Sequence, residues 1–248
     1  MFDLSNKTAL ITGAGQGVGA GIARQLAACG ARIVVNDLYA ERADATVAQL
    51  TAAGHEAQAC VFDVCDYTAV ADAVTAIESD FGVIDILINN AGVPPGMGIT
   101  KFRDTLPADW RAYMDVNIYG VMNASHVVLP GMCDRGWGRI ITITSGAGTV
   151  GMNFGISSYA AGKGGGISFM RHLAIENART GVTANTVAIG IIDNQPDPEA
   201  TAAIARSVPT GRLGTPEDIG SFCVYLASEE ASWMTGQTVH LNGGSITT

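Results

Sequence analysis

Short runs rich in β-branched residues alternate with longer segments of helical periodicity over most of the chain. The expected strands are 8–11, 32–36, 59–62, 84–88, 139–144, 183–187 and 238–241. The expected helices are 17–28, 40–53, 68–81, 107–135, 157–179 and 216–226. Alternation of this kind builds βαβ units with right-handed crossovers. The sequence therefore predicts an α/β fold, with a doubly wound parallel sheet of about seven strands and helices on both faces.

The composition agrees with a deeply buried sheet and restricts the partners. Of the 248 residues, 48% are apolar and only 15% are charged. No segment in 1–190 has the composition of a linker. We therefore expect one domain, 1–248. The net charge of −9 opposes binding to nucleic acid or to an anionic membrane surface. A small substrate of low charge is the expected partner.

The cysteines indicate a reducing compartment. Their number, five, is odd, and none has Cys-x-x-Cys spacing, so we expect reduced core residues in a cytoplasmic protein. Cys60 and Cys65 flank Asp63, but the four histidines are scattered, and no metal site is expected. No basic segment precedes an apolar one at the N-terminus, and no run of eighteen apolar residues occurs. The chain is expected to be neither secreted nor membrane-spanning.

The segment 190–209 interrupts the regular alternation with several aspartates and prolines, followed by a short helical run at 199–206. Segments of this length are often lids over a site, and this one follows the end of an expected strand, where doubly wound sheets bind ligands. We expect a substrate lid at 190–209. A solvated surface excursion is the alternative.

Four glycines, at positions 13, 15, 17 and 19, fall between the first expected strand and helix. The common Gly-x-Gly-x-x-Gly spacing fails at each start, whereas Thr12-Gly13-x-x-x-Gly17-x-Gly19 describes the segment. Without side chains, the backbone can approach a pyrophosphate at the helix N-terminus. The segment predicts a phosphate-binding turn, although a tight strand–helix connection would use the same residues.

Asp37 ends the second expected strand, twenty residues after Gly17. A carboxylate there can accept hydrogen bonds from the ribose hydroxyls of an adenosine. Its neighbours are Asn36 and Leu38 rather than an arginine, so a 2′-phosphate would meet like charge. We expect NAD rather than NADP. Alternatively, Asp37 only begins the turn toward the next helix.

Tyr159 and Lys163 are four residues apart in an expected helix, so their side chains share one face. A neighbouring ammonium favours the phenolate and lowers the phenol pKa from its ordinary value of about 10. A phenol tuned in this way can exchange a proton with a substrate hydroxyl near neutral pH. Alone, the pair is a weak signal, because this spacing occurs by chance in many exposed helices.

With the tetrad Asn89-Asn90-Ala91-Gly92 and with Ser145, these motifs follow one another in a specific order. In that order and spacing the chain resembles the short-chain dehydrogenase/reductase family over nearly its whole length. The segments 211–219 and 235–244 also look like C-terminal signatures of that family. The resemblance implies a single-domain Rossmann-type fold. It also implies hydride transfer between a nicotinamide cofactor and a secondary alcohol or ketone.

The resemblance implies four catalytic residues. Tyr159 would be the proton donor or acceptor, and Lys163 would lower its pKa and hold the nicotinamide ribose. Ser145 would hydrogen-bond the substrate oxygen, and Asn117 would anchor a proton-relay water. Besides Tyr159 and Lys163, the implied cofactor-binding residues are Gly13, Gln16, Gly17, Val18, Gly19, Asp37, Leu38, Asp63, Val64, Asn89, Ala91, Gly92, Gly190 and Ile192. For Asn89 and Asn117 the alternative is a capping or strand-linking amide without a chemical part.

The chain departs from the family pattern at several positions. Thr142 and Thr144 stand where asparagine and serine are frequent, and Ile189 stands where proline is frequent. Tyr159 follows Ser145 by fourteen residues, one more than is usual, so we expect a remodelled loop at 152–158. Glycines 162, 164, 165 and 166 each disfavour a helix by about 1 kcal/mol relative to alanine. We expect them to pack closely against a helix of a partner subunit.

Mostly apolar positions near these motifs form the candidate substrate pocket: Pro94, Pro95, Met97, Ser145, Gly146, Met152, Phe154, Ile192 and Asp193. The leading expectation is an NAD-dependent oxidoreductase acting on a secondary alcohol or ketone of low charge. Reduction of 3-oxoacyl groups on a carrier protein ranks second, because an acidic chain suits an acidic carrier poorly. A non-catalytic dinucleotide sensor is an alternative of another class. The resemblance also implies a homodimer or homotetramer built through the Tyr159 helix and the C-terminal strand.

Overall fold

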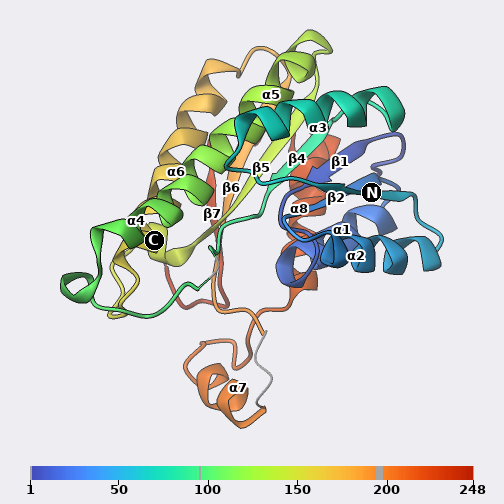
Figure 1. Ribbon diagram of the computed structural model, residues 1–248. Helices are drawn as coiled ribbons and strands as arrows, with labels where there is room; N and C mark the ends of the chain where they lie inside the picture. Colours follow the sequence, from blue (N-terminus) through green and yellow to red (C-terminus); the bar gives the residue numbers. More distant parts are fainter. Residues whose placement is uncertain (1, 95, 194–197, 248) are drawn as a thin grey trace.

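The computed structural model of the chain describes residues 2–94, 96–193 and 198–247. In these residues, parallel strands form a seven-stranded sheet in the order β3-β2-β1-β4-β5-β6-β7 (Figure 1). The strands are β1 Thr8–Ile11, β2 Arg32–Asp37, β3 Ala57–Val61, β4 Ile86–Asn89, β5 Gly138–Ser145, β6 Val182–Ile189 and β7 Thr238–Leu241. Strand order reverses between β1 and β4, which is the point where doubly wound sheets bind ligands. The predicted α/β fold is confirmed.

Helices cover both faces of the sheet (Figure 1). They are α1 Gly17–Ala28, α2 Ala40–Ala52, α3 Tyr67–Asp80, α4 Pro107–Met114, α5 Gly120–Asp134, α6 Ser157–Glu176, α7 Pro198–Ala205 and α8 Pro216–Ala227. The core beneath α1, α2 and α8 is separate from the core beneath α3, α5 and α6. Both faces of the sheet are therefore buried, as parallel sheets require.

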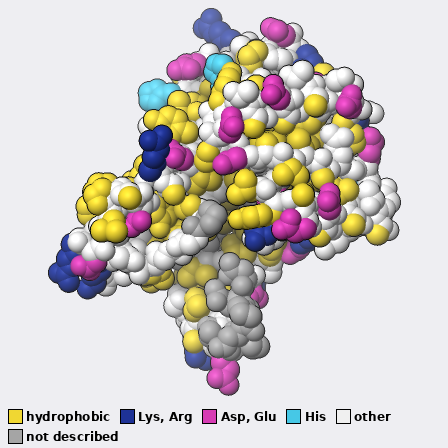
Figure 2. Space-filling model, in the orientation of Figure 1, with side chains coloured by type: hydrophobic (Ala, Val, Ile, Leu, Met, Phe, Trp, Pro, Cys, Tyr) yellow, Lys and Arg dark blue, Asp and Glu magenta, His cyan; other side chains and the backbone are white. Residues whose placement is uncertain are grey.

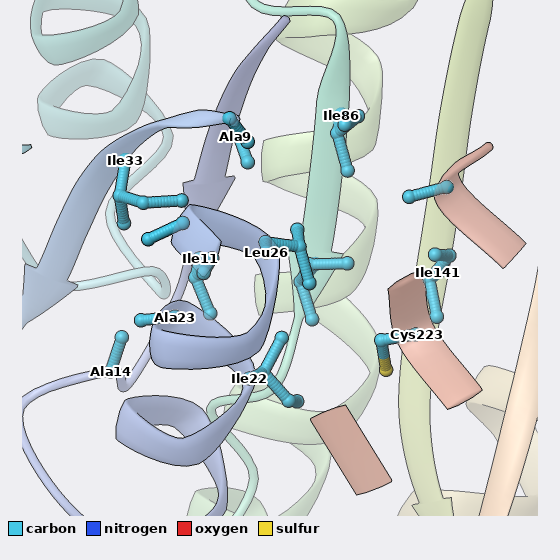
Figure 3. Packing of buried hydrophobic residues seen from close by; sticks show 14 of the residues in the cluster. Ala9, Ile11, Ala14, Ile22, Ala23, Leu26, Ile33, Ile86, Ile141 and Cys223 are labelled. Atoms are coloured by element: carbon cyan, nitrogen blue, oxygen red, sulfur yellow. The ribbon is translucent and has the colours of Figure 1, made fainter. Parts of the chain in front are cut away.

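Successive residues of the central strands enter opposite cores. On β1, Ala9 and Ile11 pack in the core beneath α1 (Figure 3). Leu10 packs in the core beneath α5. All three side chains are completely buried, and each buried Leu or Ile contributes about 1.5–3 kcal/mol of transfer free energy. A shift of β1 by one residue would move each of these side chains to the opposite core. Because the side chains on both faces are apolar, the polar turns that flank the strand must help to fix its register.

The predicted continuous helix 107–135 is interrupted. Between α4 and α5 the backbone forms a π-helical turn, Asp115–Tyr119. The Asn117 side chain donates a hydrogen bond from Nδ2 to the carbonyl oxygen of Tyr113, in the preceding turn, at 3.0 Å. Such turns are frequently found at functional sites. Helical periodicity alone did not reveal this one.

The glycines of α6 pack closely, as predicted, and the neighbours that the structure shows belong to the same chain. A Cβ on Gly162 would lie 2.8 Å from the carbonyl oxygen of Tyr113, and one on Gly165 would lie 2.7 Å from Ile118 Cδ1. Gly166 similarly faces the Asn117 backbone, and Gly164 faces Gly148. The small residues thus allow α6 to lie directly against the π-helical turn.

Two excursions leave the carboxyl end of the sheet. One comprises residues 96–106 and α4, and the other contains α7, which lies away from the sheet (Figure 1). Figure 2 shows them as two separate lobes. Residues 194–197 of the predicted lid and the candidate substrate residue Pro95 lie outside the described residues. In the described part of the chain, no helix has the length and apolarity needed to cross a membrane.

Candidate active site

The glycine-rich turn leaves the N-terminus of α1 open. Gly13 and Gly17 have φ values of +61° and +55°, which favour glycine, and a Cβ on Gly17 would meet nothing within 4 Å. Gln16 is the N-cap residue, but its side chain makes no capping hydrogen bond. Gly19 instead packs against Asn90, whose Nδ2 would lie 2.6 Å from an added Cβ. Free backbone N–H groups at a helix N-terminus favour a phosphate group.

Asp37 lies at the end of β2, beside this turn. Its Oδ2 accepts a hydrogen bond from the Gly15 amide at 3.1 Å, and Oδ1 accepts one from the Tyr39 amide at 3.2 Å. The residue is only 6% exposed. The guanidinium of Arg42 lies 4.3 Å from the centre of the Tyr39 ring, and the Arg42 Cβ approaches Gly15. The sequence did not indicate this arginine, because it is not an immediate neighbour of Asp37 in the chain.

The segment after β3 completes this side of the site. Asp63 is exposed and its Oδ1 accepts from the Cys65 amide at 2.9 Å, whereas Val64 is buried. Asn36 Nδ2 donates to the carbonyl oxygens of Cys60 and Phe62, at 3.1 and 3.0 Å. The Asn36 side chain therefore fixes the chain that leads to Asp63 and Val64, a role that the sequence did not indicate.

The tetrad after β4 is tied to the glycine-rich turn. Thr12 Oγ1 accepts from the amides of Asn90 and Ala91, at 3.0 and 3.2 Å. Asn90 Nδ2 donates to the carbonyl oxygens of Thr12 and Gly13, both at 2.9 Å. Thr12 and Asn90 thereby hold together two segments that are almost eighty residues apart in the chain.

The Asn89 side chain forms hydrogen bonds that link strands, which was the alternative expected for it beside cofactor binding. Its Nδ2 donates to Ser125 Oγ at 3.2 Å and to Thr142 Oγ1 at 3.3 Å, and the residue is 2% exposed. These bonds link β4 to β5 and α5. The Asn89 side-chain amide is thus used within the protein, while Ala91 and Gly92 follow it toward the carboxyl end of the sheet.

Ser145, Tyr159 and Lys163 come together at the carboxyl end of β5. The Ser145 hydroxyl lies close enough to the Tyr159 hydroxyl to influence its pKa. Ser145 Oγ accepts a hydrogen bond from the Ala147 amide at 3.2 Å, which fixes its orientation. Burial raises the pKa of the Tyr159 hydroxyl, and the neighbouring Ser145 side chain lowers it in part. The net direction is opposite to the lowering that Lys163 was expected to cause.

Lys163 is 6% exposed, and burial lowers its pKa to about 8. Its Nζ donates to the carbonyl oxygen of Ile143 at 3.0 Å and lies 5.7 Å from the centre of the Tyr159 ring. The Thr144 hydroxyl donates to the Lys163 carbonyl oxygen at 3.3 Å. The ammonium group is therefore held between β5 and the Tyr159 ring, as the spacing of the pair predicted.

Asn117 faces the same space from the π-helical turn. Its Nδ2 is bonded to Tyr113, but Oδ1 is buried and has no hydrogen-bond partner among the described residues. A Cβ placed on Gly92 would lie 2.8 Å from this oxygen and 3.1 Å from Lys163 Cε. Asn117, Gly92 and Lys163 therefore border one small space with a free acceptor. Buried acceptors without partners are rare and indicate a missing polar group.

The predicted substrate residues do not form a single pocket. A cavity of about 560 Å³ is lined by Pro94, Met97 and Tyr159. Ile192 instead lines a second cavity of about 210 Å³ with Gly190, beyond the ends of β6 and β7. Met152 lies near Gly146, with Cε 3.3 Å from an added Cβ. Phe154 and Asp193 are exposed and line neither cavity.

These residues suit a nicotinamide dinucleotide. An uncapped helix with open space before it could hold the pyrophosphate, and the Asp37 carboxylate could hold the adenosine ribose. The unpaired Asn117 oxygen and the buried ammonium of Lys163 could hold polar groups at the nicotinamide end of such a cofactor. The fold and the residues at the carboxyl end of its sheet together define the class of dinucleotide-binding proteins.

Comparisons with known proteins identify the family. A family model described as enoyl-(acyl carrier protein) reductase matches residues 13–245. The 3-oxoacyl-(acyl-carrier-protein) reductase of Vibrio cholerae serotype O1 is 38% identical over 248 residues, which cover 98% of each chain. The chain belongs to the short-chain dehydrogenase/reductase family, which confirms the resemblance and implies an oxidoreductase that binds a nicotinamide dinucleotide.

Solved structures of similar proteins agree. A gluconate 5-dehydrogenase from Burkholderia cenocepacia J2315, in complex with NADP and tartrate, has a TM-score of 0.90 and 34% identity, covering 98% of this chain and 96% of that one. A 7α-hydroxysteroid dehydrogenase, complexed with NADH and 7-oxoglycochenodeoxycholic acid, has a TM-score of 0.91 and 33% identity, covering 100% and 97%. The similar structures thus include both dinucleotides.

Proposed function

We propose that the protein transfers a hydride between a nicotinamide dinucleotide and the carbon of a carbonyl or secondary alcohol, with Tyr159 as the proton donor or acceptor. The observation that carries the proposal is the placement of Tyr159 next to Ser145 and to the buried ammonium of Lys163, whose Nζ lies 5.7 Å from the centre of the Tyr159 ring. A partly buried phenol beside an ammonium can give its proton to a substrate oxygen.

In this mechanism the bound cofactor supplies the hydride or accepts it. Ser145 Oγ holds the substrate oxygen and stabilises the negative charge that develops there. Tyr159 Oη gives its proton to that oxygen during reduction and takes it back during oxidation. Lys163 holds the cofactor ribose and favours the phenolate, while Asn117 Oδ1 accepts a hydrogen bond from the group that relays the proton.

For the substrate, we propose a 3-oxoacyl group. The sequence placed this reading second, but the matching family description and the V. cholerae reductase favour it over an unspecified low-charge alcohol. The net charge of −9 still opposes an acidic carrier protein. A secondary alcohol on a larger apolar or polyhydroxy compound is the second candidate, favoured by the names of the two similar structures.

For the cofactor, we propose a preference for NAD. The Asp37 carboxylate is 6% exposed at the end of β2, where it accepts amide hydrogen bonds. In the described residues it forms no ion pair within 4.0 Å, so no cation neutralises it there. A 2′-phosphate would approach an uncompensated negative charge. Arg42 is the nearby residue that could oppose this preference.

We also propose that α7 and the segment up to Pro209 act as a substrate lid. Val208 lines the second cavity beside Gly190, so the lid segment reaches the carboxyl end of β6.

We further propose that the protein is a homodimer or homotetramer. The strand β7 lies at the edge of the sheet, and Ile175 on α6 is 74% exposed. Both features are suited to subunit contacts. Light scattering coupled to size-exclusion chromatography measures the oligomer directly.

Nicotinamide absorbance tests the proposal. The purified protein is mixed with NADH or NADPH and with 3-oxoacyl thioesters of N-acetylcysteamine, ketosteroids or keto sugar acids. We expect turnover with a 3-oxoacyl thioester and a higher kcat/KM with NADH. Turnover of ketosteroids or keto sugar acids, without turnover of 3-oxoacyl thioesters, would favour the second candidate as the substrate class. Cofactor binding without turnover of any class would favour the dinucleotide sensor.

A further inference from the structure

A cavity of about 560 Å³ lies beside Tyr159, between α4 with its preceding loop and the segment 155–159. Its apolar lining comes from Met97, Phe102, Leu106, Trp110, Tyr113 and Ile156. Polar side chains contribute to the lining as well, among them Thr100, Ser157 and Ser158. The volume is within the range of small-molecule sites. Most of these lining residues come from a part of the chain to which the sequence assigned no function.

The aromatic wall of this cavity is rigid. The rings of Phe102 and Trp110 stack with centroids 5.0 Å apart and an angle of 26°. Trp110 Nε1 donates to Thr105 Oγ1 at 2.8 Å, and Thr105 Oγ1 donates to the Phe102 carbonyl oxygen at 2.8 Å. The wall is therefore held in place before any ligand arrives, which reduces the entropy lost on binding.

The two loops that border the cavity are joined by a backbone hydrogen bond. The Thr100 amide donates to the Gly155 carbonyl oxygen at 2.8 Å. A Cβ on Gly155 would lie 2.6 Å from the Thr100 carbonyl oxygen, so this contact requires a glycine. The last part of the Ser145–Tyr159 loop, residues 155–159, therefore forms one side of the cavity, whereas residues 151–154 are exposed.

Apolar side chains near the cavity are unusually exposed. Ile99 is 77% exposed, Leu106 is 66% exposed and Phe102 is 51% exposed, and hydrophobic side chains gather on this lobe (Figure 2). Contiguous exposed apolar groups mark binding surfaces. The carboxylates of Asp104 and Asp109 also border the cavity, although Arg103 and the Leu106 amide partly compensate them. An anionic group would be repelled there.

We propose that this cavity is the subsite for the uncharged apolar part of the substrate, an aliphatic chain or an alicyclic ring, whose reacting carbonyl lies at Tyr159. Phe102 and Trp110 are then specificity-determining residues, because their stacked rings form the wall that the apolar group contacts. The inference rests on the proposed function, since Tyr159 both borders the cavity and moves the proton.

A chain-length series tests the subsite. The kcat/KM of the wild type is measured for 3-oxoacyl thioesters of N-acetylcysteamine, from acetoacetyl to 3-oxododecanoyl. We expect kcat/KM to rise by about fourfold per methylene until the cavity is filled. Ala112 lines the cavity, and Ala112→Phe should lower the ratio of long-chain to short-chain kcat/KM by at least tenfold. Trp110→Ala should flatten the dependence on chain length.

The matched control is Ala48→Phe, which adds the same side chain at an exposed position of α2. It should retain the wild-type chain-length dependence. Equal losses on long and short substrates in Ala112→Phe, or no dependence on chain length in the wild type, would overturn the subsite while leaving the proposed function intact. A change in oligomeric state with unchanged chain-length dependence would instead assign the surface to a subunit contact.

A binding measurement separates the subsite from catalysis. Isothermal titration calorimetry with decan-2-one should show saturable binding to the wild type and to Ala48→Phe, and at least tenfold weaker binding to Ala112→Phe. This result would support the subsite even if no thioester were turned over, in which case only the proposed function would fail. Absence of saturable binding to the wild type would contradict the subsite directly.

Discussion

Gly92 and Lys163 are in such close contact that the glycine has no room for a side chain. An added Cβ would lie 3.1 Å from Lys163 Cε, and closer still to Nζ. The ammonium is simultaneously bonded to the carbonyl oxygen of Ile143 at 3.0 Å. The position of the lysine charge therefore depends on a residue that carries no functional group.

Gly92→Ala should displace Lys163 without unfolding the protein, since the obstructed atoms are the tip of a flexible side chain. We expect kcat/KM to fall on the order of a hundredfold, because small misplacements at a reacting centre have effects of this size. Steady-state kinetics and thermal melting measure the two quantities. Gly151→Ala is the matched control, because an added Cβ there meets nothing within 4 Å. Wild-type kinetics in Gly92→Ala would show that this contact does not set the lysine position.

The depressed pKa of Lys163 predicts a pH-dependent contribution to stability. Its folded pKa of about 8 is below the unfolded value of about 10.4, so the unfolded state binds more protons between these values. The free energy of unfolding contributed by this group therefore rises with pH between about 8 and about 10.4, by about 3 kcal/mol, and does not change with pH outside this window.

Urea unfolding of the wild type and Lys163→Met at a series of pH values tests this prediction. The difference between the two proteins isolates the lysine, because buried thiols such as Cys223, whose pKa is raised to about 12, contribute equally to both. We expect the wild type to gain stability relative to Lys163→Met as pH rises above 8. A constant difference would show that the lysine titrates normally in the folded protein.

Asp37→Ala should lower the preference for NADH over NADPH by at least tenfold, because the negative charge that opposes a 2′-phosphate is lost. It should also destabilise the protein by about 1–3 kcal/mol, since the amides of Gly15 and Tyr39 lose their acceptor. Asp37→Asn keeps an acceptor oxygen and removes only the charge. If both variants keep the wild-type cofactor ratio, the preference is set elsewhere, and Arg42 becomes the first residue to test.

Gly162→Ala should destabilise the protein although alanine is the better helix former by about 1 kcal/mol. The added Cβ would lie 2.8 Å from a backbone oxygen, that of Tyr113, which cannot move without shifting the π-helical turn. Gly165→Ala is the matched variant, because its neighbour is the movable tip of Ile118. Chemical denaturation should rank Gly162→Ala as the less stable protein. The reverse order would contradict the close packing of α6 on this turn.

The sequence predicted the parts of the fold that depend on local pattern. Each expected strand agrees with the observed one to within two residues at either end. Tyr159 and Lys163 share one face of α6 because helical spacing dictates it. The π-helical turn at Asn117 was not predicted, because helical periodicity continues through it and the side-chain bond that accompanies it leaves no periodic pattern.

Contacts between distant segments could not be read from the sequence. The bonds of Thr12 to the amides of Asn90 and Ala91 join segments far apart in the chain. Burial, which no spacing rule reports, raises the pKa of Tyr159, and the sequence did not indicate this effect. The wall formed by Phe102 and Trp110 was missed because neither residue belongs to a motif.

The most direct measurement of the central claim compares Tyr159→Phe with the wild type, using NADH fluorescence for binding and absorbance for turnover. Because only the proton-transferring hydroxyl is removed, we expect the Kd for NADH to stay within about twofold while kcat falls by at least about a thousandfold. Turnover at a rate near that of the wild type would contradict the account.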